Sequence, residues 1–527
     1  MGLALCLLYV LVLAVLSVYG IHRSYLVVMA LRLRERTRIL KEGVPAVPLS
    51  EIVAGSSLPC VTIQLPMYNE ATVVRRLLSR IAEIEYPRDR LEIQVLDDST
   101  DETCVIAKRA VDDLSRAGID AVYIHRTDRL GYKAGALAEG LKVAKGELVA
   151  LFDADFVPSR DFLRAVVRHF EDPSVAMVQT RWGHINRDRS LLTRVAALML
   201  DGHHLMENRI RAAAGWFFNF AGTGGIWRKC AIESAGGWQH DTLTEDLDLS
   251  YRAQLQGWKF VYRENVVTPA ELPEDISAFR AQQFRWAVGT VQTSRKILGR
   301  VLRAKLPWSL RKEAFFHLTP HFAYPLTILL GVILLPVVLL LPASNSPLLI
   351  WAIDVPLCFG TTGSLFAFYG MAERVQGRRS RNAFWLVPAL IAVGVGIAPL
   401  VTRAMVRGFR TMAGEFVRTP KKGASGANRY RTNLSIPMAE SVLCVISFAS
   451  TVASVHSGHY IAVPFAALFT AGYAYMASSM LVEQLSRSAG PVLDSDALVS
   501  VDAEHAIRGG ARGGPRSAPL VDEPAAE

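Results

Sequence analysis

The sequence has few cysteines, and none of them form closely spaced pairs. No two of the six follow a CxxC spacing; they are Cys6, Cys60, Cys104, Cys230, Cys358 and Cys444. Structural zinc sites use closely spaced cysteine and histidine pairs, and disulfide frameworks belong to small secreted domains. We therefore expect neither zinc nor disulfides to stabilise the chain, and its soluble part suits a reducing compartment.

The basic residues form no stripe along a soluble segment of the kind that binds nucleic acid. The net charge is +10, but the basic residues gather beside apolar runs, in blocks at 23–41, 374–381 and 403–431. Short basic loops of membrane proteins remain on the cytoplasmic side of the bilayer. The charge therefore indicates membrane topology, and we expect no nucleic-acid partner.

The first apolar run lacks the marks of a cleaved signal peptide. Leu3 to Gly20 carries no charge, no basic residue precedes it, and basic residues follow it from Arg23. A signal peptide has a basic start and a small-residue cleavage site. We expect a membrane helix here, with the N-terminus outside.

Four further apolar runs are long enough, or nearly so, to cross a bilayer, which takes about 20 residues. They are 318–341, 348–370, 441–455 and 460–482. Another apolar stretch, 384–401, holds two prolines and two glycines between basic flanks. A crossing there would separate basic blocks that should share a side. We predict five spans with 384–401 as a helix in the membrane interface; six spans are the alternative.

Strand and helix patterns alternate between residues 59 and 185, which predicts a parallel sheet with crossover helices. The predicted strands are 61–65, 91–96, 121–125, 148–152 and 175–179; the predicted helices are 71–84, 102–117, 133–144 and 161–170. Residues from about 185 to 310 are expected to be more helical. Ligands of such sheets bind beyond the carboxyl ends of the strands. Asp97-Asp98 follow the second strand, and Asp153 and Asp155 the fourth, so we expect both pairs on one rim.

Acids and cations on this rim suggest a site for a diphosphate and a metal. Two carboxylates two residues apart, as in Asp153 and Asp155, suit Mg²⁺ or Mn²⁺ bound to a diphosphate. A solvated turn is the alternative, and Asp97-Asp98 can equally precede a helix as its N-cap. Arg129, Tyr132 and Lys133 follow the third strand and could hold phosphates, or simply start a helix.

Two later clusters fit a transfer reaction. Thr242 to Glu245 has the pattern of a capping box, and Asp246 is either a general base for a hydroxyl nucleophile or one more capping acid. Gln282 to Trp286 places an amide, a guanidinium and an indole together. Arg285 could pair with a phosphate and Trp286 could stack on a sugar, unless that tryptophan only packs against the sheet.

Together, these motifs resemble the processive family 2 glycosyltransferases of the cellulose synthase-like group. That family's signature is D, DxD, TED and QxxRW, followed by a gating loop FxVTxK. The chain has each in order, the gating loop being Phe416 to Lys421 with Arg418 where the family has valine. The stretches 179–182, 235–238 and 282–286 look most similar to β-mannan (glucomannan) synthases. The resemblance covers roughly residues 60–482.

The resemblance implies a GT-A fold and an inverting transfer from an α-linked nucleoside-diphosphate sugar to a growing β-glycan. It also implies roles for residues at the matching positions. Catalysis is assigned to Asp246 as the base, together with Glu245. The nucleotide-sugar ligands are Gln64, Tyr68, Glu70, Asp97, Asp98, Lys133, Asp153, Gln282 and Arg285. Mg²⁺ or Mn²⁺ is expected on Asp153 and Asp155. Acceptor contacts are Trp286, Gln179 and Trp182, and the gating loop is represented by Phe416, Thr419 and Lys421.

These expectations define an α/β GT-A domain with a mostly parallel sheet, embedded in a multi-span α-helical membrane protein. The predicted division is an N-terminal membrane helix with basic flank (1–31), a linker (32–58), a cytosolic catalytic domain with interfacial helices (59–310), two membrane helices (311–371), an interfacial helix with the gating-type loop (372–435), two membrane helices (436–483) and a disordered cytosolic tail (484–527). No long segment follows the last span, so no C-terminal cyclic-nucleotide sensor is expected.

The predicted function is elongation of a β-linked polysaccharide, coupled to its translocation across the bilayer. GDP-mannose and UDP-glucose are the favoured donors, with UDP-N-acetylglucosamine also open, and the partners are the donor, the glycan acceptor and the lipid bilayer. One alternative is a non-processive transferase that glycosylates a ceramide- or diacylglycerol-type lipid. A transport subunit with an inactive transferase domain is a third hypothesis, although all the acids that it would be expected to lose are present.

Overall fold

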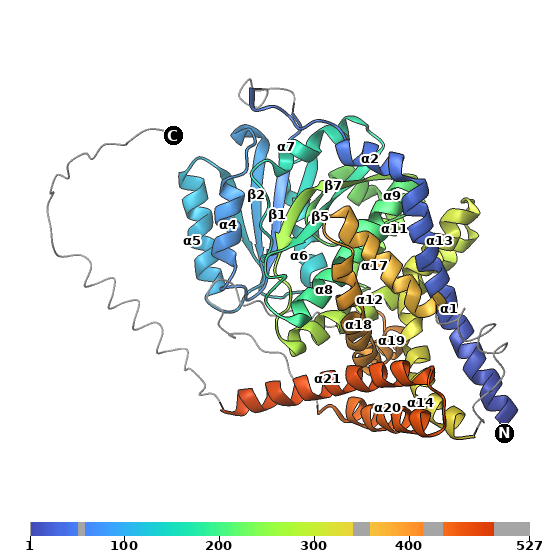
Figure 1. Cartoon of the computed structure of the whole chain (residues 1–527). Coiled ribbons are helices and arrows are strands. Elements are labelled where there is room, and N and C mark those ends of the chain that lie inside the picture. Colours follow the sequence, from blue (N-terminus) through green and yellow to red (C-terminus); the bar gives the residue numbers. More distant parts are fainter. Residues whose placement is uncertain (1, 51–57, 341–358, 415–435, 490–527) are drawn as a thin grey trace, which may run out of the picture. The chain divides into compact units, whose positions relative to one another are not determined.

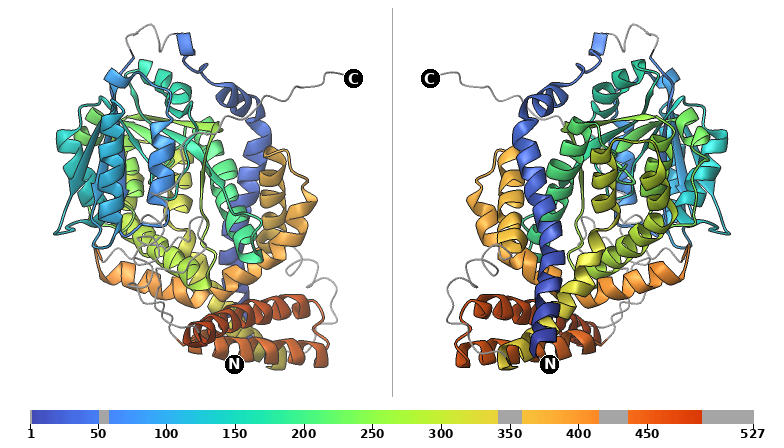
Figure 2. Two further views of the ribbon diagram at one scale, coloured as in Figure 1. Left: turned by 90° about the vertical axis from the view of Figure 1, so that its left-hand side faces the viewer. Right: turned by 90° about the vertical axis from the view of Figure 1, so that its right-hand side faces the viewer.

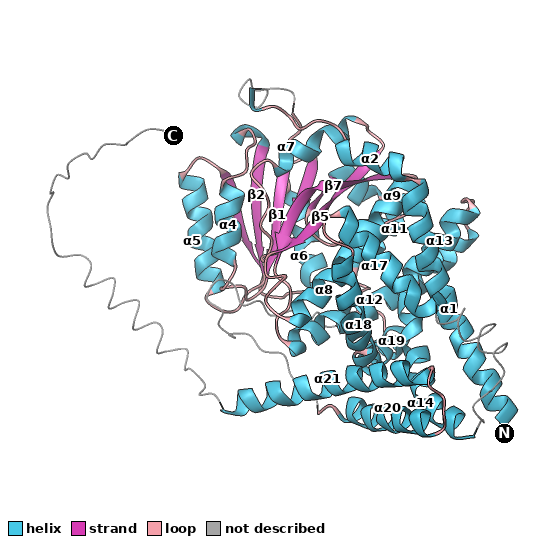
Figure 3. Cartoon of the chain, viewed as in Figure 1, coloured by secondary structure: helices cyan, strands magenta, loops and turns pink. Residues whose placement is uncertain are grey.

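A seven-stranded sheet is the centre of the soluble part (Figure 3). The structure is a computed structural model and describes residues 2–50, 58–340, 359–414 and 436–489. The strand order is β3-β2-β1-β4-β6-β5-β7. The strands are β1 Val61–Met67, β2 Leu91–Asp97, β3 Asp120–His125, β4 Leu148–Leu151, β5 Val175–His184, β6 Gly225–Arg228 and β7 Lys259–Ala270.

The sheet is mostly parallel, as predicted. Strand β1 pairs in parallel with β2 and β4, β2 with β3, and β5 with β7. Strand β6 runs antiparallel to both β4 and β5. The expectation of a more helical part after residue 185 missed β6 and β7. It also ended β5 too early, because that strand continues from Gln179 to His184.

Helices cover both faces of the sheet (Figure 1). One apolar core joins β1 and β2 to α4 (Val74–Ala82), α5 (Thr103–Arg116) and α7 (Phe162–Val166). A second core joins the sheet to α6 (Tyr132–Val143), α10 (Lys229–Ser234) and α11 (Glu245–Leu255). Strands β1 and β2 are buried along their whole length, as expected for central parallel strands covered on both sides. The carboxyl ends of the strands are left as the place for a ligand.

A group of helices connects the sheet to the apolar helices. Helix α12 (Ile276–Arg303) is the longest of them and packs against α11, α13 (Trp308–Leu318) and α19 (Ala398–Arg410). The remaining members are α2 Arg34–Glu42, α8 Leu191–Gly202, the π-helical turn His203–Asn208, α9 Arg209–Ala214, α17 Ser364–Val375 and α18 Arg381–Gly396. Short 3-10 or π turns lie at Arg88–Arg90, Val167–Glu171, Pro320–Phe322 and Phe359–Gly363.

Four described helices are long and apolar enough to cross a membrane. They are α1 (Gly2–Arg32), α14 (Ala323–Leu340), α20 (Met438–His456) and α21 (Ala462–Ala489). Figure 2 shows the start of α1 gathered with α14 and α20 away from the sheet, and α14 packs on both. Helices α18 and α19 are bent by 50° at their junction and count together as a fifth span only if they form one broken crossing. The interfacial position of 384–401 thus stays a prediction.

Some predicted segments lie outside the described residues. They include residues 348–358 of the run 348–370; of the rest of this run, the structure describes Phe359–Gly363 and the start of α17. Phe416, Thr419 and Lys421 and the tail from residue 490 also lie outside them.

Buried ion pairs join the apolar helices to the part of the chain that contains the sheet. The Arg280 guanidinium, in the first turns of α12, lies 2.8 Å from a Glu440 carboxylate oxygen in the first turn of α20. Glu313 on α13 accepts hydrogen bonds from Arg211 on α9, at 3.0 Å, and contacts His22 on α1, at 2.8 Å. All of these side chains are nearly inaccessible to solvent. Because breaking a buried pair leaves an uncompensated charge, these contacts fix the helices in register.

Candidate active site

A cavity lies at the carboxyl ends of β1, β2 and β4, where the sequence predicted a ligand. Tyr68 and Glu70 line it after β1, Asp98 after β2, and Asp153 and Asp155 after β4. The two acid pairs expected on one rim therefore contribute to one site. The other predicted residues that line it are Lys133, Trp182, Glu245, Asp246, Gln282, Arg285 and Trp286.

One end of the cavity is built around Asp98. The Arg126 guanidinium donates to both carboxylate oxygens of Asp98, at 2.8 and 2.6 Å, and to the carbonyl oxygens of Leu130 and Tyr132. These hydrogen bonds hold the loop from 126 to 132 in place. In that loop, the Arg129 guanidinium lies 3.3 Å from the ring centroid of Tyr68. Arginine and aromatic faces attract each other in this arrangement. The stacked pair forms a flat polar wall suited to a planar nucleobase.

Three predicted ligands lie behind the cavity and do not line it. Gln64 is fully buried on β1, and its amide donates to Gln94 at 3.0 Å. Asp97 is also fully buried, and it accepts hydrogen bonds from the Ser99 N–H and the Tyr123 hydroxyl. Gln64 and Asp97 thus stabilise β1 and β2, the strands that precede Tyr68 and Asp98.

The third of these residues is Gln179. Its amide nitrogen lies 2.8 to 3.2 Å from the carbonyl oxygens of Thr180, Thr223 and Gly224, and its oxygen accepts from the Ala221 N–H. The Trp182 indole donates to the Thr223 carbonyl at 3.2 Å. Gln179 therefore shapes the 221–224 loop, while Trp182 reaches the cavity wall.

Asp97 also belongs to a group of three possible metal-binding side chains. Ligand atoms of Asp97, Cys104 and His125 lie within 4.8 Å of one another. The Cys104 thiol donates to the Ser99 carbonyl, and Asp97 already accepts two hydrogen bonds. Asp97 and Cys104 thus already have hydrogen-bond partners in Ser99 and Tyr123, and the acids expected to bind metal, Asp153 and Asp155, are elsewhere.

Asp246 lies in the first turn of α11, as the sequence suggested, but the expected capping box does not form. The N-cap is Thr244, and its side chain makes no capping hydrogen bond. The Thr244 hydroxyl instead contacts the Thr293 hydroxyl at 3.1 Å, and the Leu243 N–H donates to Gln292. Gln292 and Thr293 of α12 therefore form the hydrogen bonds that a local cap would otherwise have formed.

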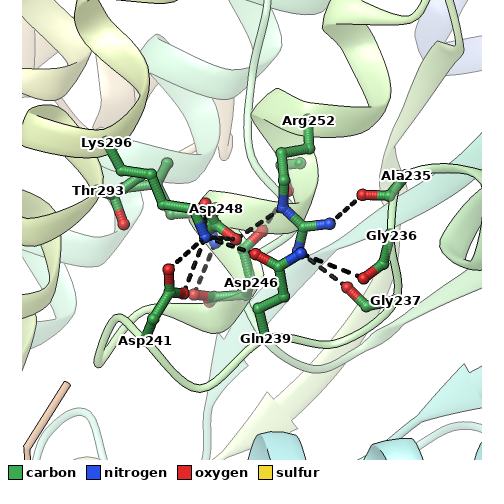
Figure 4. Close-up of polar contacts among 12 residues, drawn as sticks. Ala235, Gly236, Gly237, Gln239, Asp241, Asp246, Asp248, Arg252, Thr293 and Lys296 are labelled. Carbon is green, nitrogen blue, oxygen red and sulfur yellow. Dashed lines mark hydrogen bonds and ion pairs between the residues drawn. The ribbon is translucent and has the colours of Figure 1, made fainter. Parts of the chain in front are cut away.

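A buried polar network on the far side of α11 holds this turn in place (Figure 4). Asp248 accepts from Arg252 at 2.8 Å and from the Lys296 ammonium at 3.1 Å. Lys296 also binds Asp241, and Arg252 donates to the carbonyl of Gly237. Asp248 is fully buried. Since each charge in the network has a partner of opposite sign or a carbonyl, α11 is anchored to α12 and to the preceding loop.

The pKa of the Asp246 carboxyl group lies far above its usual value. Burial raises the pKa of Asp246 to about 7, and the neighbouring Glu245 carboxylate adds to the shift. The Lys133 ammonium, the Leu247 N–H and the Arg285 guanidinium oppose it. The pKa of Glu245 is also raised, mainly by burial. A general base works best when its pKa lies near the working pH, so Asp246 fits that role better than that of a capping acid.

The raised pKa of Asp246 predicts how the reaction rate depends on pH. A base must be deprotonated to act, so kcat/KM should rise about tenfold per pH unit below pH 7 and level off above it, because kcat/KM reports the groups of the free enzyme. Initial rates across pH 5 to 9 would measure the profile. A profile that is flat between pH 5.5 and 8 would contradict the raised pKa of Asp246.

Gly222 makes room for the Asp246 carboxylate. A Cβ atom at this position would lie 2.9 Å from Asp246 Oδ2 and 3.6 Å from Lys133 Nζ, and the φ angle is +82°. Any other residue would be strained there and would push against the carboxylate.

We predict that Gly222→Ala lowers kcat by about 100-fold, since a small misplacement of a catalytic group has effects of that size. Gly118→Ala is a matched control, because Gly118 has a φ of +76° and open space around its Cβ position. Both variants should lose about 1–2 kcal/mol of stability from the left-handed backbone. Equal activities of the two variants would show that contact with Asp246 is unimportant.

The QxxRW motif reaches the cavity from α12. Gln282, Arg285 and Trp286 all line it. Burial lowers the pKa of Arg285, and the nearby acids Glu245, Asp153 and Asp246 oppose this shift only in part. The cavity is thus closed by acids from the sheet on one side and by a guanidinium and an indole on the other, which suits a diphosphate next to a sugar.

The donor set at Asp153 and Asp155 fits a hard divalent cation. Both carboxylates line the cavity, and the side chain of Asp153 is 36% exposed toward it. Asp155 accepts a hydrogen bond from the Glu271 N–H at 3.2 Å, which orients the carboxylate. Mg²⁺ and Mn²⁺ prefer carboxylate oxygens together with substrate phosphates, and the residues present match that preference.

The structure adds residues that the sequence did not single out. Arg126, Gly222, His184 and Glu271 hold or line the cavity. Arg126 follows the third strand directly, so the rule that selected the acids at strand ends would also have selected it. His184 and Gly222 give no such signal, because the end of β5 that holds His184 and the loop that holds Gly222 were not predicted.

Comparison with known proteins agrees with this geometry. Residues 59–289 match the family model described as Glycosyltransferase like family 2. These residues form a family 2 glycosyltransferase domain. The predicted GT-A fold class is therefore confirmed, and the domain contains the whole sheet and most of the cavity.

The glycosyltransferase domain also has curated relatives. Glucomannan 4-beta-mannosyltransferase 2 of Arabidopsis thaliana is 40% identical over 310 residues, which are 56% of this chain and 58% of the relative. Glucomannan 4-beta-mannosyltransferase 1 of Oryza sativa subsp. japonica is 38% identical over 301 residues, or 55% and 58%. The chain thus matches little more than half the length of these relatives. The resemblance to cellulose synthase-like glucomannan synthases is confirmed for that part.

Among solved structures, the chain is similar to the mannosyltransferase PcManGT from Pyrobaculum calidifontis in complex with GDP-Man and Mn²⁺. The identity is 24%, the match covers 68% of this chain and 98% of that chain, and the TM-score is 0.46.

Proposed function

We propose that the protein is a membrane-embedded inverting hexosyltransferase that extends a β-linked polysaccharide, with GDP-mannose as its donor. The position of Asp246 carries the proposal. Its carboxylate lines the same cavity as the acids after β4 and the arginine and tryptophan of α12. A base, a diphosphate site and a sugar-stacking indole in one cavity are the parts that a direct displacement at a sugar carbon requires.

In the proposed reaction, Asp246 takes the proton of the acceptor hydroxyl as its oxygen attacks the sugar. Arg285 and Lys133 hold the departing diphosphate, and Trp286 stacks under the terminal sugar of the acceptor. A divalent cation bound at Asp153 and Asp155 would add positive charge against the leaving group. The choice of mannose rests on the names of the curated relatives, and UDP-glucose is the second donor to be tested.

Polymer extension and export are part of the proposal, and the apolar helices support it. We place the catalytic domain in the cytosol, with the product leaving through the membrane helices. The buried pairs Arg280–Glu440 and His22–Glu313 link those helices to the catalytic part, as a shared path for the glycan would require.

A donor panel tests the proposal. Purified full-length protein would be incubated with radiolabelled GDP-mannose, UDP-glucose and UDP-N-acetylglucosamine, and the products would be sized and digested with linkage-specific glycosidases. We expect a β-linked mannose polymer. A product consisting of one sugar on a lipid would refute the synthase, and turnover with UDP-glucose alone would refute the donor.

A further inference from the structure

Lys133 occupies an unusual position at the start of α6. It is the second residue of that helix and follows Gly131 and Tyr132, which both have positive φ angles of 71° and 51°. Its side chain is only 14% exposed, whereas lysine normally lies at the surface. The turn thus directs a cation into the cavity.

The ammonium group of Lys133 is bound to the acid that would receive the metal. Its Nζ lies 2.5 Å from Asp153 Oδ1 and donates to the Gly222 carbonyl at 2.9 Å. An opposite charge this close favours the charged form of the lysine. Lys133 therefore remains positively charged.

A divalent cation on Asp153 would compete with this ammonium. Two positive charges at one carboxylate repel strongly where little water screens them. A nucleoside diphosphate changes the balance, because its negative charges can bind a cation and an ammonium at once. The lysine side chain is long and flexible, and it binds phosphate as a point charge.

We propose that Lys133 acts as an internal counter-ion that keeps Asp153 closed to a divalent cation until a nucleoside diphosphate arrives and draws the ammonium away. The inference rests on the proposed metal- and donor-binding function. It adds that the binding of the metal depends on the binding of the nucleotide. Metal and nucleotide then bind together, and neither should bind tightly alone.

Mn²⁺ binding to the full-length protein in detergent tests the inference by electron paramagnetic resonance. Wild type should bind Mn²⁺ at least tenfold more tightly when GDP is present. Lys133→Gln should bind Mn²⁺ alone at least tenfold more tightly than wild type, although the variant has lost a contact. Lys133→Arg, which keeps the charge, should behave as wild type does. Lys133→Gln combined with Asp153→Asn should lose the tight site.

Lys142→Gln is the matched control, because Lys142 lies on the same helix and pairs with Glu139 at the exposed surface. It should leave Mn²⁺ binding unchanged. If Lys133→Gln binds Mn²⁺ alone no better than wild type, Lys133 is not the competing cation. If wild type binds no Mn²⁺ even with GDP or UDP, the metal assignment of the proposed function fails and the inference fails with it. Melting temperatures would show whether each variant is folded.

Discussion

Asp246→Asn is expected to reduce transfer by about 1,000-fold while nucleotide affinity stays within about twofold of wild type. Asparagine has the same shape as aspartate but cannot accept the acceptor's proton, and general base catalysis contributes about 10²- to 10⁴-fold. The Leu247 N–H that now bonds to Asp246 Oδ1 at 2.8 Å can bond equally well to the amide oxygen. Folding should therefore be preserved.

The measurement combines single-turnover transfer rates with calorimetric titration of GDP. Asp112→Asn, the same change at an exposed position on α5, serves as the control and should keep wild-type rates. A variant at Asp246 that retains a tenth of the activity would assign the base to another group, with Glu245 as the nearest candidate.

Asp155→Asn should weaken Mn²⁺-dependent nucleotide binding by tenfold or more, which corresponds to about 1.4 kcal/mol. The amide removes a negative charge from the donor set, and a hard cation prefers a carboxylate. Its oxygen can still accept the hydrogen bond from the Glu271 N–H, so the local structure should persist.

Nucleotide dissociation constants with and without Mn²⁺ would separate this effect from a general loss of binding. Only the constant with metal should change. Asp161→Asn, at the exposed start of α7, is the control. If Asp155→Asn keeps the full metal dependence, the cation is held elsewhere in the cavity.

The parallel half of the sheet and its acidic rim could be predicted because local pattern and topology agree there. Strands β1, β2 and β4 are short apolar runs separated by amphipathic helices, and parallel connection brings their carboxyl ends together. Asp98, Asp153 and Asp155 therefore share the cavity whatever the details of packing.

The rest of the site depends on contacts between distant segments. Strand β6 has only four residues and exists because β4 and β5 offer edges on both sides. The extension of β5 to His184 comes from pairing with β7. Likewise, the capping box predicted over Thr242 to Glu245 does not form, because the helix begins after Thr244, whose hydroxyl contacts Thr293 on α12.

The Arg280–Glu440 pair makes the lipid environment relevant to the active site. Arg280 lies less than two turns before Gln282, Arg285 and Trp286 on the same helix, and Glu440 begins the apolar helix α20. Membrane helices tilt to match the thickness of the hydrocarbon layer. We expect a tilt of α20 to be passed through this ion pair to α12, so the catalytic rate should vary with the acyl-chain length of the surrounding phospholipids.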